Sequence, residues 1–173
     1  MRALVVYESM FGNTREVAQA IADSLSSEFV VELLPVDEAP SRITDDIDLL
    51  VVGGPTHAFG MSRPGTRLQA ASKAAKTSTS ITLGIREWMD LLQSNRGDTL
   101  AAAFDTRVRR PRVPGSAARK VAKRLHRLGF MAATRPTTFW VTGTTGPLLE
   151  GERDRAHEWG RTLVTCGAMT SSA

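Results

Sequence analysis

The segment Ser9–Thr14 has residue types and a spacing that suit the binding of a phosphate. It lies between a short apolar run at residues 3–7 and a helical stripe that begins at Thr14. Gly12 and Asn13 tolerate unusual backbone angles, so consecutive amide groups can point into one concavity. Hydroxyl and amide side chains add donors, and the positive end of the following helix favours an anion. The segment therefore predicts a phosphate site without a lysine, and the alternative is an ordinary Asn-Thr cap on a surface turn.

Several motifs that would indicate other chemistry are absent. The sequence has no G-x-x-x-x-G-K-[ST], which excludes a P-loop nucleoside triphosphatase, and no G-x-G-x-x-G dinucleotide fingerprint. It also has no G-x-S-x-G nucleophile elbow. The histidines His57, His126 and His157 lack the spacing of metal ligands, and the single cysteine, Cys166, has no acid–base companion nearby in the sequence. We therefore expect neither a metal site nor a side-chain acid–base catalyst.

Strand-like apolar runs alternate with helical stripes along the chain. The expected strands are residues 3–7, 29–34, 49–54, 99–104 and 138–142. The expected helices are residues 14–25, 85–92, 116–128 and 150–164. This alternation predicts an α/β fold with a five-stranded parallel sheet, helices on both faces and the doubly wound strand order 2-1-3-4-5. A ligand in such a sheet binds beyond the carboxyl ends of the strands, where the loops 8–14, 54–63 and 104–115 meet.

Length and composition indicate one ordinary globular domain. The chain has 173 residues, of which 42% are hydrophobic and 23% are charged, and a domain of this size can bury a sufficient core without disulfides. We assign residues 1–166 to this domain and expect residues 167–173 to form a frayed tail. Residues 66–84 are rich in Ala, Ser, Thr and Lys and are expected to form a mobile excursion. No apolar run approaches the roughly 20 residues of a membrane span, and the N-terminus has no cleavage-site pattern, so we expect a cytoplasmic protein.

The first loop resembles the phosphate loop of the flavodoxin family. That loop reads Ser/Thr-x-Thr/x-Gly-Asn-Thr after the first strand, and Ser9–Thr14 matches it with Phe11 at the variable position. Residues 54–56, Gly-Pro-Thr, are similar to the usual opening of the family's loop after strand 3, and residues 143–148 resemble flavodoxin-domain proteins of high-GC bacteria. The resemblance covers nearly the whole chain and departs mainly at residues 66–84. It implies a flavodoxin-like three-layer sandwich that binds flavin mononucleotide (FMN).

The resemblance also implies which residues hold the cofactor. The phosphate would be held by Ser9, Met10, Phe11, Gly12, Asn13 and Thr14. The isoalloxazine ring would be held by Pro55, Thr56, His57, Ala58, Phe59 and Gly60. In this second set, His57 or Phe59 would stack on the face of the ring. The far edge of the ring would contact Phe104, Asp105, Thr106 and Arg107.

The third loop departs from the family pattern. Family members often offer an aromatic residue and acidic residues there, whereas in this loop no aromatic residue follows Phe104 and arginines dominate. A cationic loop favours the anionic, reduced form of a flavin. We therefore expect a flavin that is less strongly reducing than that of an acidic flavodoxin.

Positive charge gathers in one part of the chain. The formal net charge is +4, and residues 106–149 contain no Asp or Glu. The basic residues of this stretch are Arg107, Arg109, Arg110, Arg112, Arg119, Lys120, Lys123, Arg124, Arg127 and Arg135. They indicate an anionic partner or substrate, and the alternative is a solvated helix face. Nucleic acid is a less favoured alternative, because no aromatic residue interleaves with the charges of residues 116–128 and no recognition motif is present.

These observations favour an FMN-binding, flavodoxin-like protein that transfers electrons to a redox partner protein or to a small redox substrate. Three alternatives stay open. One is a flavin-dependent oxidoreductase that acts on a quinone or a porphyrinogen-like molecule. Another is a module that binds nucleic acid or an acidic partner without flavin, and the third is a protein that uses a related deazaflavin. In the flavin-based cases the cofactor supplies the redox chemistry, and the protein supplies position and electrostatics.

Overall fold

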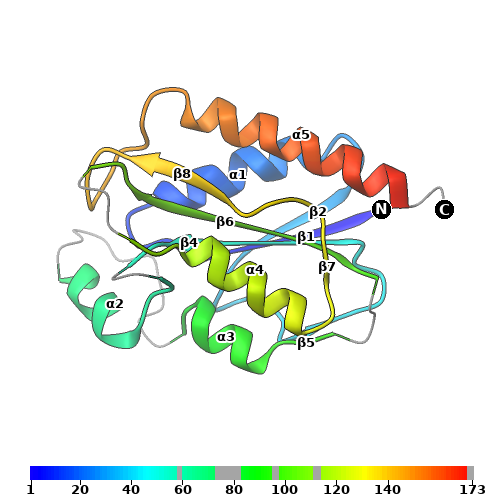
Figure 1. Cartoon of the computed structure of the whole chain (residues 1–173), viewed down its shortest axis with the longest axis horizontal. Coiled ribbons are helices and arrows are strands. Elements are labelled where there is room, and N and C mark those ends of the chain that lie inside the picture. Colours follow the sequence, from blue (N-terminus) through cyan, green and yellow to red (C-terminus); the bar gives the residue numbers. More distant parts are fainter. Residues whose placement is uncertain (58–59, 73–82, 95–97, 111–113, 171–173) are drawn as a thin grey trace.

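The computed structural model describes residues 1–57, 60–72, 83–94, 98–110 and 114–170. Its centre is a parallel sheet (Figure 1) of the strands β1 (Arg2–Tyr7), β2 (Val30–Pro35), β4 (Leu49–Pro55), β6 (Leu100–Val108), β7 (Met131–Ala132) and β8 (Thr137–Val141). The strand order begins β2-β1-β4-β6, and β7 and β8 both pair with β6. The predicted order 2-1-3-4-5 is therefore confirmed, with β7 and β8 together in the fifth position.

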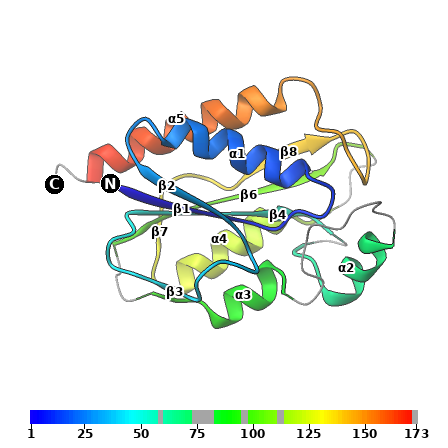
Figure 2. The same ribbon diagram turned by 180° about the vertical axis from the view of Figure 1, so that it is seen from behind.

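Helices cover both faces of the sheet, which gives three layers (Figures 1 and 2). One face carries α1 (Asn13–Leu25) and α5 (Glu152–Thr170), and the other carries α3 (Ile85–Leu91) and α4 (Ala117–Arg127). A separate short pair joins β3 (Arg42–Ile43) to β5 (Gln93–Ser94). In both views α2 (Pro64–Ala71) lies beyond the carboxyl ends of the central strands.

The two central strands bury side chains on both of their faces. On β1, Val5 packs into the core under α1 and α5, whereas Leu4 packs into the core under α3 and α4. A strand covered on both faces needs apolar residues at consecutive positions, which explains the unbroken apolar runs in the sequence. In the middle of β6, Phe104 meets Phe139 and Trp159 in edge-to-face contacts, with ring centroids 6.0 and 6.2 Å apart. These rings anchor the strand that leads into the third loop.

Two elements extend beyond their predicted limits, and one helix was not predicted. Strand β6 continues to Val108, past the predicted end at residue 104, because the side chain of Asp105 is buried and its Oδ2 accepts hydrogen bonds from neighbouring segments. The prediction of a mobile excursion at residues 66–84 is wrong for residues 66–71, which belong to α2. Pro64 suits the first turn of that helix, and the Thr66 hydroxyl accepts the backbone N–H of Arg63 at 2.9 Å. Residues 73–82 lie outside the described residues.

The last helix also exceeds its predicted end. Helix α5 runs to Thr170 instead of residue 164, so residues 167–170, predicted as part of a frayed tail, are helical, and 171–173 lie outside the described residues. Within the described part of the chain, no helix combines the length and the apolar character that crossing a membrane requires.

Candidate functional site

The carboxyl ends of β1, β4 and β6 surround a cavity of about 170 Å³. The predicted site residues that line it are Ser9, Met10, Phe11, Asn13, Thr14, Pro55, Thr56, His57, Thr106 and Arg107. Val108, Val141 and Thr144 complete the lining. The cavity therefore brings together residues from all three predicted loops. It lies at the switch point between β1 and β4, where the order of the strands in the sheet reverses direction.

The start of α1 leaves its first amide groups without a side-chain cap. Gly12 occupies the cap position in the left-handed region, with φ at +90°, which favours glycine. Thr14 instead turns inward and shares a 2.7 Å hydrogen bond with the Thr106 hydroxyl, and Asn13 donates its Nδ2–H to the Thr145 carbonyl at 3.1 Å. The alternative of an ordinary Asn-Thr cap is therefore wrong, because both side chains bond to other segments. Helix N-termini with unoccupied amides are suited to phosphate.

The second loop forms a tight turn over the cavity. The Thr56 N–H donates to the Thr106 carbonyl at 2.9 Å, and His57 and Gly60 exchange two backbone hydrogen bonds of 2.8 and 2.9 Å. A Cβ on Gly60 would lie 2.5 Å from the Lys120 Nζ, so the Lys120 side chain of α4 lies against this turn. Sequence reasoning identified Lys120 only as one of many basic residues on a helix. Ala58 and Phe59, predicted to contact the ring, lie outside the described residues.

Two predicted contacts of the third loop are placed elsewhere by the structure. Phe104 is part of the aromatic cluster in the core, and Asp105 is 0% exposed. Neither side chain lines the cavity. Asp105 Oδ2 accepts hydrogen bonds from the Thr56 hydroxyl at 2.8 Å, the Ser116 hydroxyl at 2.6 Å and the Ala118 N–H at 3.0 Å. The Asp105 carboxylate therefore joins β6 to the start of α4 and to the second loop, which makes it a positioning residue.

Arg107 brings a positive charge to the cavity wall. Its Nη1 donates to the Gly115 carbonyl at 2.6 Å, and its guanidinium lies 5.2 Å from the centre of the Trp140 ring. Of the further arginines in this loop, Arg109 and Arg110 are exposed, and Arg112 lies outside the described residues. None of the described lining residues is acidic. The cavity is therefore electropositive.

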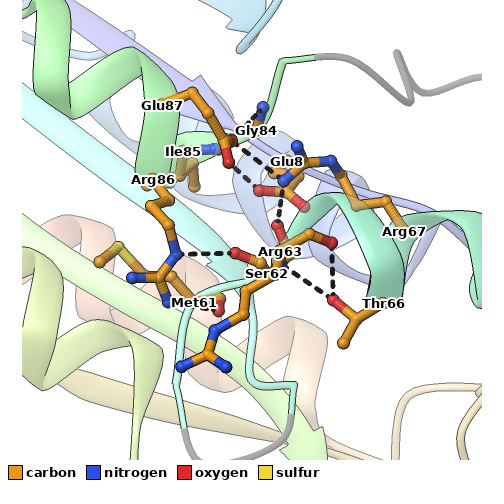
Figure 3. Close-up of polar contacts among 10 residues, drawn as sticks. All are labelled: Glu8, Met61, Ser62, Arg63, Thr66, Arg67, Gly84, Ile85, Arg86 and Glu87. Carbon is orange, nitrogen blue, oxygen red and sulfur yellow. Dashed lines mark hydrogen bonds and ion pairs between the residues drawn. The ribbon is translucent and has the colours of Figure 1, made fainter.

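A buried ionic network lies behind the second loop, and sequence reasoning missed it (Figure 3). Glu8 is 1% exposed, and its Oε2 accepts the Ile85 N–H at 2.8 Å. Arg67 is 2% exposed, and its Nη1 contacts Glu87 Oε2 at 3.0 Å and donates to the Ser62 hydroxyl at 2.9 Å. Burial raises the pKa of Glu8, and the Ser62 hydroxyl, the Ile85 N–H and the Arg67 charge offset part of this effect.

The network holds the far end of the second loop. Arg86 donates from Nε to the Ser62 carbonyl at 3.1 Å and from Nη2 to the Met61 carbonyl at 3.0 Å (Figure 3). Glu8 directly follows β1, Arg67 comes from α2 and Arg86 from α3, so three elements meet on one loop. The only signal in the sequence is a carboxylate placed directly after an apolar strand, which is weak because its partners are more than 50 residues away.

His57 also lies in this environment. Burial and the nearby charge of Arg67 lower the pKa of His57 below its usual value of 6.5. The imidazole is therefore neutral at pH 7. Among the described residues, no three His, Cys, Asp or Glu side chains gather where they could hold a metal ion.

This geometry defines a doubly wound α/β protein with an anion-suited cavity at its switch point, and comparisons with known proteins agree on the fold. A family model for flavodoxins matches residues 5–82. A flavodoxin from the domain Archaea has a TM-score of 0.62 at 16% identity, and the match covers 97% of this chain and 99% of that one. Oxidised flavodoxin 1 from Bacillus cereus has a TM-score of 0.65 at 18% identity, with 95% and 98% covered.

A larger structure contains the same fold. The Flv1 flavodiiron core from Synechocystis sp. PCC6803 has a TM-score of 0.62 at 15% identity, and the match covers 98% of this chain and 36% of that one. A sequence search among curated proteins finds no match. The family match over residues 5–82 and the structural likeness over nearly the whole length show that the chain has a flavodoxin-like fold. The resemblance predicted from Ser9–Thr14 is thereby confirmed.

Proposed function

We propose that this protein binds FMN in the cavity between the three loops and acts as an electron-transfer flavoprotein. At the level of the family, the comparisons support a flavin-binding electron-transfer protein. The observation that carries the choice of FMN is the start of α1, where Gly12 provides no side-chain cap and the Asn13 and Thr14 side chains bond to other segments. A phosphate suits these amide groups, and riboflavin lacks one.

The residues around the cavity fit such a cofactor. The wall near α1 includes the hydroxyl groups of Ser9 and Thr14, and the described lining contains Arg107 and no carboxylate. The Thr56 hydroxyl donates to Asp105. After Gly60, Arg86 binds the carbonyl groups of residues 61 and 62, and Arg67 of the buried network binds the Ser62 hydroxyl. These contacts orient the loop that would contact the ring and exclude water from its rear. The flavin, when bound, supplies the redox chemistry.

Positive charge near the cavity affects the midpoint potential of a bound flavin and the kind of partner that the protein would bind. Arg107 lines the cavity, and the Lys120 ammonium lies against the Gly60 turn. Cations stabilise the anionic reduced flavin relative to the oxidised one, so the midpoint potential would be higher than in a flavodoxin whose site is acidic. The same charges suit an anionic partner protein or substrate.

Titration of the flavin-free protein with FMN and with riboflavin, followed by flavin fluorescence, tests the phosphate contact. FMN is expected to bind at least about tenfold more tightly, which corresponds to about 1.4 kcal/mol. The matched variant Asn13→Asp places a carboxylate of the same shape in the phosphate loop, so it should weaken FMN and leave riboflavin binding unchanged. Equal affinity for the two flavins in the natural protein would contradict the proposal.

A further inference from the structure

A second cavity adjoins the first and has a different character. It measures about 460 Å³ and lies between β8 and the start of α4. Its lining consists of Arg107, Pro114, Gly115, Ser116, Arg119, Thr138 and Trp140, all described residues. We call it the edge groove. Arg107 lines both cavities, so the edge groove adjoins the proposed FMN site.

The edge groove offers two cations and one aromatic face. The Arg107 guanidinium lies 5.2 Å from the centre of the Trp140 ring and is fixed by its 2.6 Å hydrogen bond to the Gly115 carbonyl. Arg119 is exposed on the first turn of α4, and Trp140 is half-buried on the edge strand. None of the described lining residues is acidic.

The helix terminus itself does not supply the site. The first amides of α4 are already engaged, because Ala117 donates to the Thr56 hydroxyl, Ala118 to Asp105 and Arg119 to the Ser116 hydroxyl. The nearby Asp105 does not line the edge groove, and its Oδ2 accepts three hydrogen bonds, one of them from the lining residue Ser116. Recognition of an anion in the edge groove therefore depends on the two guanidinium groups and the indole ring.

We propose that the edge groove binds a small planar anion, an aromatic carboxylate, sulfonate or phosphate. Its ring packs against Trp140 and the stacked Arg107, and its charged group pairs with Arg119 and Arg107. The volume lies within the roughly 300–1,000 Å³ of sites for such molecules. The binding site goes beyond the proposed function and does not depend on it. With FMN bound, its occupant would lie next to the cofactor.

Heteronuclear NMR of the full-length protein, with naphthalene-2-sulfonate as probe, tests this inference. The indole N–H signal of Trp140, assigned by its loss in Trp140→Phe, is expected to shift with saturable binding. Naphthalene-2-sulfonamide, which has the same rings without the charge, is expected to bind at least about tenfold more weakly. Arg119→Gln should weaken the sulfonate by a similar factor, whereas the matched control Arg127→Gln, an exposed arginine near the end of the same helix, should not.

Three outcomes would overturn the proposal. They are an unmoved Trp140 signal, equal binding of sulfonate and sulfonamide, or equal effects of Arg119→Gln and Arg127→Gln. Retention of FMN is measured on the same samples by flavin absorbance. Because Arg119 does not line the first cavity, loss of the edge groove leaves FMN retention intact, and a failure of FMN binding leaves the Trp140 shift intact.

Discussion

Replacing Arg67 with methionine removes the guanidinium group that lies between the two carboxylates of the buried network. The Arg67 side chain is 1% exposed and lies between Glu8, which is itself 1% exposed, and Glu87, whose side chain is 28% exposed. Water can partly solvate the charge of Glu87 once Arg67 is gone, but it cannot reach the charge of Glu8. The variant must therefore either keep a buried carboxylate without its counter-charge or protonate Glu8.

Protonation limits the cost and makes it depend on pH. Protonating a carboxyl group with the ordinary pKa of 4.5 costs about 3.4 kcal/mol at pH 7 and about 0.7 kcal/mol at pH 5. Removal of one partner from a buried ion pair typically costs about 3–5 kcal/mol. We therefore expect Arg67→Met to lower the free energy of unfolding by about 3–4 kcal/mol at pH 7, and by clearly less at pH 5.

Urea unfolding followed by circular dichroism at the two pH values measures this difference. The double variant Arg67→Met with Glu8→Gln removes the stranded charge and should recover most of the loss at pH 7. A cost below about 1 kcal/mol at pH 7, or a cost that is the same at pH 5, would refute the electrostatic reasoning. If the single variant does not fold at pH 7, folding of the double variant is the deciding observation.

Three further outcomes follow from the structure. Because burial raises the pKa of Glu8, the folded state binds the Glu8 proton more tightly than the unfolded state does. The contribution of Glu8 to stability therefore falls as pH rises above 4.5. The free energy of unfolding of Glu8→Gln, minus that of the natural protein, should increase between pH 5 and pH 8. The pKa of His57 is lowered, so in an NMR titration its ring signals should move below pH 6.5, and stability should be lost as pH falls through that range; a midpoint above 6.5 would contradict this. Gly53→Ala should cost several kcal/mol in urea unfolding, because a Cβ there would lie 1.9 Å from the Phe104 ring, whereas Gly65→Ala, which meets nothing within 4 Å, serves as its control.

The fold could be predicted because its evidence is local. Apolar runs such as residues 49–52 can be buried only as central strands, and the alternation with helical stripes leaves one common topology. The turn before α1 could also be predicted, because Gly12 lies in the left-handed region that favours glycine. The binding of a phosphate there stays a prediction. Strand β6 was read as ending at Phe104 because Asp105 looks like a loop residue. Its burial depends on Thr56 and Ser116, which are distant in the sequence.

The residues that support the site could not be predicted either, because their contacts join segments that are distant in the sequence. Glu8, Arg67 and Glu87 are ordinary charged residues in the sequence, and only the folded chain brings them into contact. Helix α2 was missed because its residues share the small and polar composition of the segment that follows. Lys120 has the pattern of a solvated helix face, and only the folded chain shows its close approach to Gly60 in the second loop.

The visible absorption spectrum of the purified protein, recorded after addition of FMN and desalting, tests the central claim most directly. We predict flavin absorption bands that survive desalting at about one flavin per chain, with FMN identified in the material released by denaturation. A colourless protein that retains no FMN would contradict the account of the Ser9–Thr14 loop as a phosphate site.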